Sequence, residues 1–400
     1  MSFGTLAVIV LAGLGGPLLA FSRRLFVPVV IGEILAGVLI GPAVLGAMDP
    51  ANSTIAFFGE VGFAMLMLTV GMHLPLREPR LLAVLRGGGV LAASVCVLAV
   101  PAGLLAAAIG GDGHAAIYSV VLASGSAAVL LPALEEAGVA SPEVMTVMAQ
   151  VTIADLLTIL SVPIVLQPQR VDHALLGGAL VALAAFTVLE LARALARHRW
   201  VHRVRSLSEQ RHWALDLRLS LLVLFLLAWI AQKGGTSILL AGFGAGVTIA
   251  LVGGPKRLST QVRGVADGFF IPLYFVVLGA RLEVAGLGSN PSTLALAVAL
   301  VGLNVVIHLV PVIIGGKRLA GGLAASAQLG VPAAVASVGL TDGVLSAGVA
   351  TAIVAAALVS LGVCTAGVQM LVRPGGPGRA PQPTAIAGGE IAHEPRGASG

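Results

Sequence analysis

The chain has 400 residues, of which 58% are hydrophobic, 10% are charged and 4% are aromatic, and its formal net charge is +5 at pH 7. Soluble globular proteins carry about 25% charged residues, so this composition excludes a soluble fold and predicts an all-α, polytopic membrane protein in the lipid bilayer. The basic residues are scattered in short loops and aromatic residues are rare, so we expect no nucleic acid as a partner.

Apolar segments recur along the chain about every 30 residues, at the length needed to cross a bilayer. The first run, 3–21, precedes Arg23 and Arg24, whereas a secretory signal carries its positive charges in front, so we expect this run to remain as a span. The sequence predicts about thirteen transmembrane helices, near 3–21, 25–43, 54–73, 88–109, 115–137, 144–166, 172–195, 214–233, 236–252, 265–283, 292–314, 319–340 and 344–371.

Basic residues in the connecting loops predict the orientation of these spans. The loops after even-numbered spans hold only Arg170, Lys233 and Arg281, whereas most other bases follow odd-numbered spans. Basic loops stay on the cytoplasmic side. We therefore expect a multi-pass protein of the cell membrane with its N-terminus outside and its C-terminus in the cytoplasm.

Two segments are expected to lie outside the spans. The stretch 193–213 is basic and contains Trp200 and Trp213, which predicts a cytoplasmic linker loop at the membrane interface. Residues 373–400 are rich in Pro, Gly and Ala and predict a disordered cytoplasmic tail. The transmembrane domain is thus expected over 1–372, and regulation through a soluble domain would require a separate regulatory subunit.

An internal repeat relates the two halves of the chain. The sequence ILAGVLIG at 34–41 resembles LLAGFGAG at 239–246, and a similar helix follows each. The two copies are seven spans apart, an odd number, so they enter the membrane from opposite sides and form an inverted repeat. The alternative is that Gly-rich membrane helices resemble one another by composition alone. The parts are repeat one, about 1–166, a linker span and basic loop, about 167–213, and repeat two, about 214–371.

Two spans carry interruptions at membrane depth. Span five contains ASGSAA at 123–128 and then Pro132, and span twelve, its repeat partner, contains SAQLGVP at 326–332. Backbone groups freed in such a segment are tolerated only where protein or water satisfies them, which predicts two crossed, broken helices. Ordinary proline kinks are the alternative.

Asp155 lies near the middle of an apolar run, 145–166, which is ~30 Å long at ~1.5 Å per residue. Inserting a carboxylate there costs about 2.5–3.5 kcal/mol, so we expect it to face the helix breaks and to serve a function. The alternative is a protonated carboxyl that only hydrogen-bonds a neighbouring helix. Ser124, Ser126 and Thr152 are the expected oxygen ligands of a cation beside it, although Thr152 alternatively bonds a carbonyl of its own helix.

Two stretches resemble signatures of a known family. VPVVIGEILAGVLIGPAVLG at 27–46 and GFFIPLYFVVLG at 268–279 are similar to those of the monovalent cation:proton antiporters of the second family, the bacterial sodium/proton exchangers and potassium-efflux antiporters. Asp155 falls where that family keeps its ion-binding aspartate. The resemblance extends over roughly 5–370. It implies the sodium/proton antiporter fold, a homodimer and elevator-type alternating access.

The chain departs from the family pattern at two positions. Many electrogenic members carry a second acid before the aspartate, where this chain has Ala154, and a lysine in the span matching span eleven, where it has none. The polar candidates for the lysine position are Asn304 and His308, which lie on one helix face. We therefore expect electroneutral exchange. His308 either pairs with empty Asp155 or, as a neutral residue, hydrogen-bonds a carbonyl freed in span five or twelve.

The predicted function is secondary active exchange of Na⁺ or K⁺ for H⁺, with Asp155 as the shared carrier and no cofactor. The alternatives are a sodium-coupled symporter of organic anions on a similar broken-helix fold, and a binding or sensor protein without transport. No HExxH, GxxxxGK[ST] or Ser-His-Asp pattern indicates an enzyme. Glu33 is expected to have a structural or interface role, and Cys96 and Cys364 are expected to be packing residues.

Overall fold

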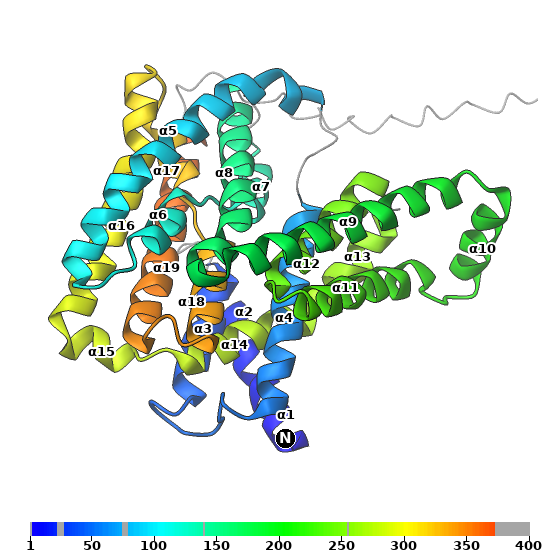
Figure 1. The fold of residues 1–400 in the computed structure, drawn as a ribbon, viewed down its shortest axis with the longest axis horizontal. Helices are drawn as coiled ribbons and strands as arrows, with labels where there is room; N and C mark the ends of the chain where they lie inside the picture. Colours follow the sequence, from blue (N-terminus) through cyan, green and yellow to red (C-terminus); the bar gives the residue numbers. More distant parts are fainter. Residues whose placement is uncertain (1, 22–27, 74–78, 139–140, 254–255, 373–400) are drawn as a thin grey trace, which may run out of the picture.

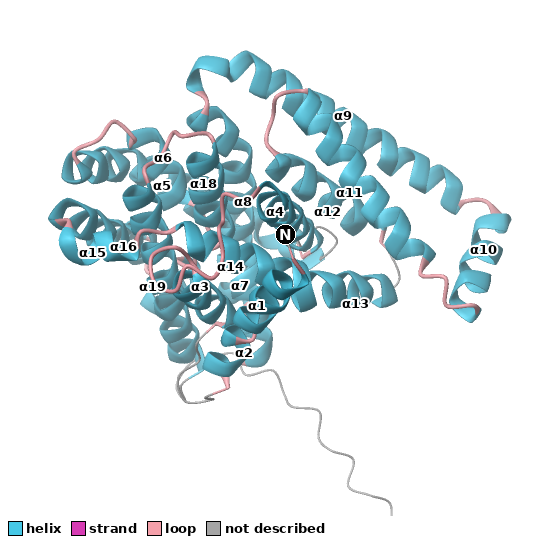
Figure 2. Ribbon diagram, turned by 90° about the horizontal axis from the view of Figure 1, so that it is seen from below, coloured by secondary structure: helices cyan, strands magenta, loops and turns pink. Residues whose placement is uncertain are grey.

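The computed structural model describes residues 2–21, 28–73, 79–138, 141–253 and 256–372, which form helices joined by turns, with no β-strand among them (Figures 1 and 2). Within this part, ten helical segments are long and apolar enough to cross a membrane, and three shorter apolar helices accompany them. The chain is therefore an all-helical, multi-pass membrane protein. The predicted tail at 373–400 and the basic loops at 22–27 and 74–78 lie outside the described residues.

One group of helices surrounds the two interrupted spans and contributes most residues of a large apolar cluster, which continues into neighbouring helices of the second group. Within it, α8 packs against α5 and against both halves of each interrupted span (Figure 1). The members of this group are α5 (Pro79–Gly110), α6 (Ala115–Ala123), α7 (Ala127–Glu136), α8 (Pro142–Leu166), α15 (Val284–Ser289), α16 (Pro291–Ile314), α17 (Leu319–Ala325), α18 (Gly330–Thr341) and α19 (Ala347–Val372).

The second group packs through close backbone contacts made at glycines. A Cβ at Gly246 of α12 would overlap the carbonyl oxygen of Leu68 in α4, and a Cβ at Gly279 of α14 would overlap that of Ile34 in α3. The members of this group are α1 (Phe3–Gly13), α2 (Gly15–Ala20), α3 (Val29–Ile40), α4 (Ser53–Met72), α9 (Val171–Ala196), α10 (Arg199–Gln210), α11 (Leu215–Lys233), α12 (Ile238–Val252), α13 (Lys256–Val265), the π-helical turn η2 (Ala266–Phe270) and α14 (Ile271–Arg281). A short 3₁₀ turn, η1 (Pro168–Arg170), joins α8 to α9.

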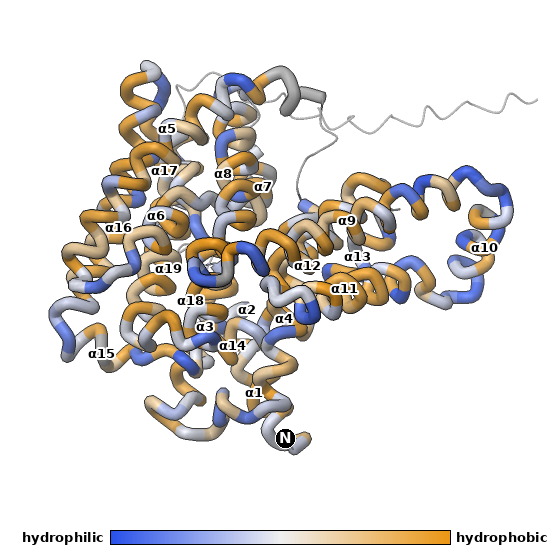
Figure 3. Tube along the Cα trace, in the orientation of Figure 1, coloured by the Kyte–Doolittle hydropathy of each residue, from blue (hydrophilic) through white to orange (hydrophobic). Residues whose placement is uncertain are grey.

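The linker predicted as a loop at 193–213 is instead mostly helical. Helices α9 and α11 pack side by side, and α10 joins them at their far end (Figure 2). Trp200, Val204 and Leu207 recur at helical spacing among basic residues, so this stretch has the pattern of an amphipathic interfacial helix. Hydrophilic residues are concentrated at this end of the molecule (Figure 3).

Candidate functional site at the two helix breaks

Helix α8 places Asp155 inside the first helix group. The helix begins after Ser141, whose hydroxyl accepts a hydrogen bond from the N–H of Val144 (3.2 Å). Pro142 occupies the first helical position, where its missing N–H costs no hydrogen bond. The 25-residue helix then brings Asp155 close to its middle, where the side chain is only 2% exposed. The carboxylate therefore lies within protein and not against lipid.

The first break separates α6 from α7 and lies beside this carboxylate. Ser124 leaves the helical conformation, and its hydroxyl donates to the carbonyl oxygen of Val121 (2.7 Å). The next helix begins at Ala127, whose backbone N–H donates to the Asp155 carboxylate. The first N–H groups of a helix have no partner inside it and carry partial positive charge. The beginning of α7 therefore stabilises a negative charge on Asp155.

The second break separates α17 from α18. Helix α17 ends in the same way as α6 does at the first break. The hydroxyl of Ser326 donates to the carbonyl oxygen of Leu323 (2.8 Å), three residues earlier, as Ser124 does in the first break. Four residues, 326–329, then pass without regular structure before α18 begins at Gly330. The two interruptions are thus real breaks with matching ends, and not proline kinks.

Gln328, which the sequence did not single out, connects the two breaks. It is 2% exposed, and its side-chain nitrogen donates to the carbonyl oxygens of Val121 (2.7 Å) and Leu122 (3.1 Å) at the end of α6. It also donates to the Asn304 side-chain oxygen on α16 (3.0 Å). The available signal was a lone amide inside an apolar, interrupted span, because a buried amide requires partners. Its partners are far away in the sequence, so the sequence does not identify them.

The two threonines around Asp155 differ in their hydrogen bonding. The hydroxyl of Thr158 donates to the carbonyl oxygen of Ala154 (2.7 Å) within α8. The hydroxyl oxygen of Thr152 is buried and has no hydrogen-bond partner, so the bond to its own helix that the sequence allowed is not formed. Thr152 and Asp155 are three residues apart and share a helix face. An orphaned hydroxyl beside a carboxylate is an available oxygen ligand.

His308 and Asn304 lie together on α16, and both are buried. Asn304 donates to the carbonyl oxygen of Ser326 in the second break (2.9 Å). His308 donates through Nδ1 to the carbonyl oxygen of Asn304 (2.9 Å), one turn earlier in its own helix. The predicted bond from His308 to a freed carbonyl is therefore made by Asn304, because the imidazole reaches the preceding turn first. No ion pair joins His308 to Asp155 among the described residues.

The comparison with protein families decides what kind of protein carries this site. A family model described as "Sodium/hydrogen exchanger, transmembrane" matches residues 6–373. The chain belongs to the sodium/hydrogen exchanger family. This confirms the resemblance seen in the sequence, and the family is one of transporters, not enzymes.

The chain is similar to curated bacterial relatives at low identity. It is 24% identical over 281 residues to the Na(+)/H(+)-K(+) antiporter GerN of Bacillus cereus, covering 67% of this chain and 69% of GerN. It is 23% identical over 328 residues to YjbQ of Bacillus subtilis, covering 78% of this chain and 52% of YjbQ. It is 25% identical over 300 residues to the glutathione-regulated potassium-efflux system protein KefC of Salmonella typhimurium, covering 74% of this chain and 48% of KefC. The chain thus spans about half the length of the last two.

A solved structure shows the same fold. The chain matches the sodium proton antiporter MjNhaP1 from Methanocaldococcus jannaschii with a TM-score of 0.61 and 15% identity, over 92% of this chain and 96% of that one. At this identity the match establishes the fold and no residue role.

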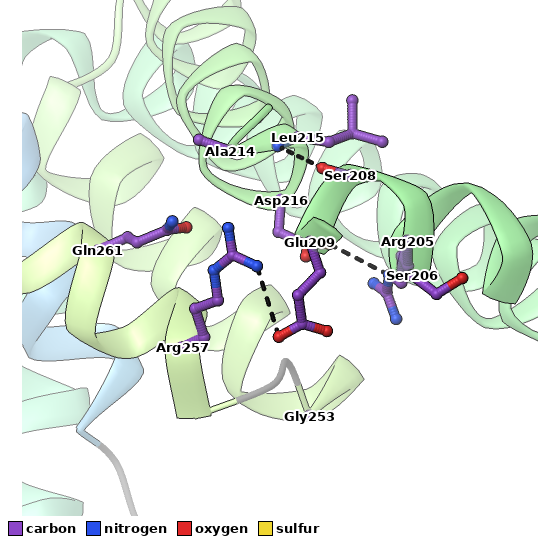
Figure 4. Close-up of a pocket in the computed structure, with 10 residues that line it drawn as sticks. All are labelled: Arg205, Ser206, Ser208, Glu209, Ala214, Leu215, Asp216, Gly253, Arg257 and Gln261. Atoms are coloured by element: carbon purple, nitrogen blue, oxygen red, sulfur yellow. Dashed lines mark hydrogen bonds and ion pairs between the residues drawn. The ribbon is translucent and has the colours of Figure 1, made fainter. Parts of the chain in front are cut away.

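Two other sets of charged groups lie in the second helix group, and not at the breaks. Glu33 is 4% exposed but belongs to α3, in the second helix group, where it packs beside Gly16 of α2. A pocket of about 410 Å³ lies where α10 meets α11 and α13 (Figure 4). Ion pairs cross it between Arg205 and Asp216 (3.1 Å) and between Arg257 and Glu209 (3.4 Å). These ion pairs connect α10 to α11 and α13.

Both cysteines, Cys96 and Cys364, are free.

Proposed function

We propose that this chain exchanges Na⁺ or K⁺ for H⁺ across the cell membrane by alternating access, with Asp155 as the shared carrier. One observation carries the proposal: a buried carboxylate receives the first N–H of a half-helix at a break in the bundle. Among the described residues, Asp155 and Glu33 are the only buried carboxylates, and only Asp155 lies at a break. An ionisable group at such depth is a functional group by default.

Competition for one carboxylate couples the two fluxes. A bound cation favours the charged form of Asp155, and a bound proton removes the charge that attracts the cation. Alkali cations prefer several oxygen ligands. We propose that the orphaned hydroxyl of Thr152 and the hydroxyls of Ser124 and Ser126 supply them. The Ser124 hydroxyl donates its hydrogen to Val121, which leaves oxygen lone pairs for a cation.

Alternating access in this proposal is a movement of one helix group against the other. We propose that the ten long and three shorter apolar helices make thirteen crossings in an inverted repeat, with the N-terminus outside and the C-terminus inside. The matching ends of α6 and α17 and the glycine contacts of α3 with α14 and α4 with α12 support the repeat. A homodimer, which the family resemblance implies, and a separate regulatory subunit are further proposals.

Electroneutral exchange is the proposed stoichiometry. The position before Asp155 is the buried Ala154, and α16 carries no lysine, so one carboxylate at the breaks is available to carry either one proton or one cation. Replacing one monovalent ion by another on a single site moves no net charge through a complete cycle.

Flux measurements on the purified protein test the function. In proteoliposomes that enclose a pH-sensitive dye, we expect Na⁺ or K⁺ gradients to drive proton movement and organic anions to drive none. Anion-driven movement would favour the sodium-coupled symporter instead. Tight cation binding without any flux would leave a binding or sensor protein.

A further inference from the structure

The side-chain nitrogen of Gln328 lies in a pocket of hydrogen-bond acceptors. It is 2.7 Å from the carbonyl oxygen of Val121, 3.1 Å from that of Leu122 and 3.4 Å from that of Ser124. It is also 3.0 Å from the side-chain oxygen of Asn304. Three of these four acceptors are backbone groups at the end of α6. The Val121 carbonyl oxygen also accepts from the Ser124 hydroxyl, whereas those of Leu122 and Ser124 are among the carbonyls that a helix end leaves without partners inside the helix.

A neutral amide suits this place for a physical reason. The end of a helix carries partial negative charge, and its free carbonyls are costly inside a membrane protein unless a donor reaches them. An amide nitrogen has two hydrogens and adds no charge next to a site whose charge must alternate. Gln328 therefore satisfies the end of α6 without competing for the cation or for the proton.

The segment that carries Gln328 is itself held from two sides. Its backbone N–H donates to the hydroxyl of Ser360 on α19 (3.0 Å). Two residues earlier, the carbonyl oxygen of Ser326 accepts from the Asn304 amide on α16 (2.9 Å). All these groups are buried. Helices α16 and α19 thus hold the backbone of the second break in place. Through its side chain, Gln328 then holds the end of α6, at the first break, in a fixed position relative to the second.

Only two residues, Gly125 and Ser126, lie between the anchored Ser124 and Ala127. Any shift of Ser124 therefore moves the Ala127 N–H that binds Asp155. Gly125 also packs closely on Val151 of α8, so the first break has little room to adjust independently.

We propose that Gln328 is a positioning residue for cation binding: by tying the second break to the end of α6, it holds the Ala127 N–H on the Asp155 carboxylate. This inference rests on the proposed function for its transport readout. It assigns the amide a role in affinity through Ala127, without contact to the cation.

Cation dependence of exchange separates positioning from a merely structural role. Gln328→Met keeps the length of the side chain and removes the donor. We expect it to raise the KM for the driving cation about tenfold, the scale of one lost hydrogen bond to a charged group. If Gln328 only supported the fold, Gln328→Met would contain less folded transporter. The maximal rate would then fall and KM would stay unchanged. Thr248→Val is the matched control, because that buried hydroxyl bonds only Gly244 within α12.

A milder variant covers the case in which Gln328→Met does not fold. Ser360→Ala removes one anchor of the Gln328 backbone and leaves the amide in place. We expect it to raise KM in the same direction by about two- to fivefold, since the Gln328 N–H loses one neutral hydrogen bond. A KM equal to that of wild type in both folded variants overturns the inference.

Hydrogen exchange supplies a readout that does not require transport. In Gln328→Met, the backbone amides of 124–127 should exchange faster than in wild type. In Thr248→Val, the same amides should exchange at the wild-type rate. If wild type transports no cation, the proposed function fails and this measurement still tests the inference. If wild type transports and the exchange at 124–127 is unchanged in Gln328→Met, the inference alone fails.

Discussion

The phenol of Tyr274 on α14 donates a buried hydrogen bond of 2.9 Å to the carbonyl oxygen of Ala333 on α18, and so joins the two helix groups. Arg281 makes a second connection between the groups by donating to the hydroxyl of Thr341 (3.0 Å). If exchange requires one group to move against the other, these bonds must break during the cycle. They stabilise the conformation described here relative to conformations in which they are broken.

Removing the Tyr274 bond should therefore speed exchange. We expect Tyr274→Phe to raise turnover at saturating cation severalfold, because it weakens this conformation by about 0.5–1.5 kcal/mol. Tyr118→Phe is the control, since the Tyr118 hydroxyl bonds Asp112 within the first helix group. Equal turnover in Tyr274→Phe and Tyr118→Phe would show that the groups do not separate at α14 and α18.

The orphaned hydroxyl of Thr152 should matter for cation affinity and not for stability. Thr152→Val removes an oxygen that has no hydrogen-bond partner, so we expect a higher KM for the cation and an unchanged or higher melting temperature. Thr158→Val removes a formed bond to Ala154 and should lower the free energy of unfolding by about 1 kcal/mol with little change in KM. The reverse pattern would remove Thr152 from the cation site.

Charge balance gives an independent prediction. With Ala154 before Asp155 and no lysine on α16, an imposed membrane potential should change neither the rate nor the end point of exchange. The check is dye-reported proton movement at several fixed potentials. A shift of the end point with potential would mean that a second titrating group takes part.

His308 should not control the pH dependence of exchange. Its Nδ1–H is committed to the Asn304 carbonyl oxygen, and no ion pair with Asp155 is found in the described chain. We expect His308→Gln to leave the pH profile of transport unchanged, although an unperturbed imidazole titrates near pH ~6.5. A flattened acid side of the profile would restore His308 as the replacement for the family lysine.

The positions of the two breaks could be predicted from the sequence because they depend on local chemistry. The Gly/Ser cluster at 123–128 contains the first break, and SAQLGVP at 326–332 contains the second. The prolines in these stretches were weaker guides. Pro132 lies inside α7, and Pro332 lies in the first turn of α18, where its missing N–H costs no helix bond.

The arrangement of side chains at the breaks was beyond prediction because it depends on partners distant in sequence. Gln328 and Val121 are 207 residues apart, and nothing local to either indicates the bond. Thr152 and Thr158 have similar surroundings in the sequence, yet only one bonds its own helix. Asn304 makes the bond to a freed carbonyl that the sequence offers as one of two roles for His308. Tertiary packing decides each of these cases.

The most direct test of the central claim is cation-driven proton movement in proteoliposomes containing Asp155→Asn. The amide keeps the shape of the side chain but cannot carry the charge for which cation and proton compete. With the variant shown to be folded by its melting temperature and elution volume, we predict no proton movement above that of empty liposomes. Exchange near the wild-type rate would contradict the account.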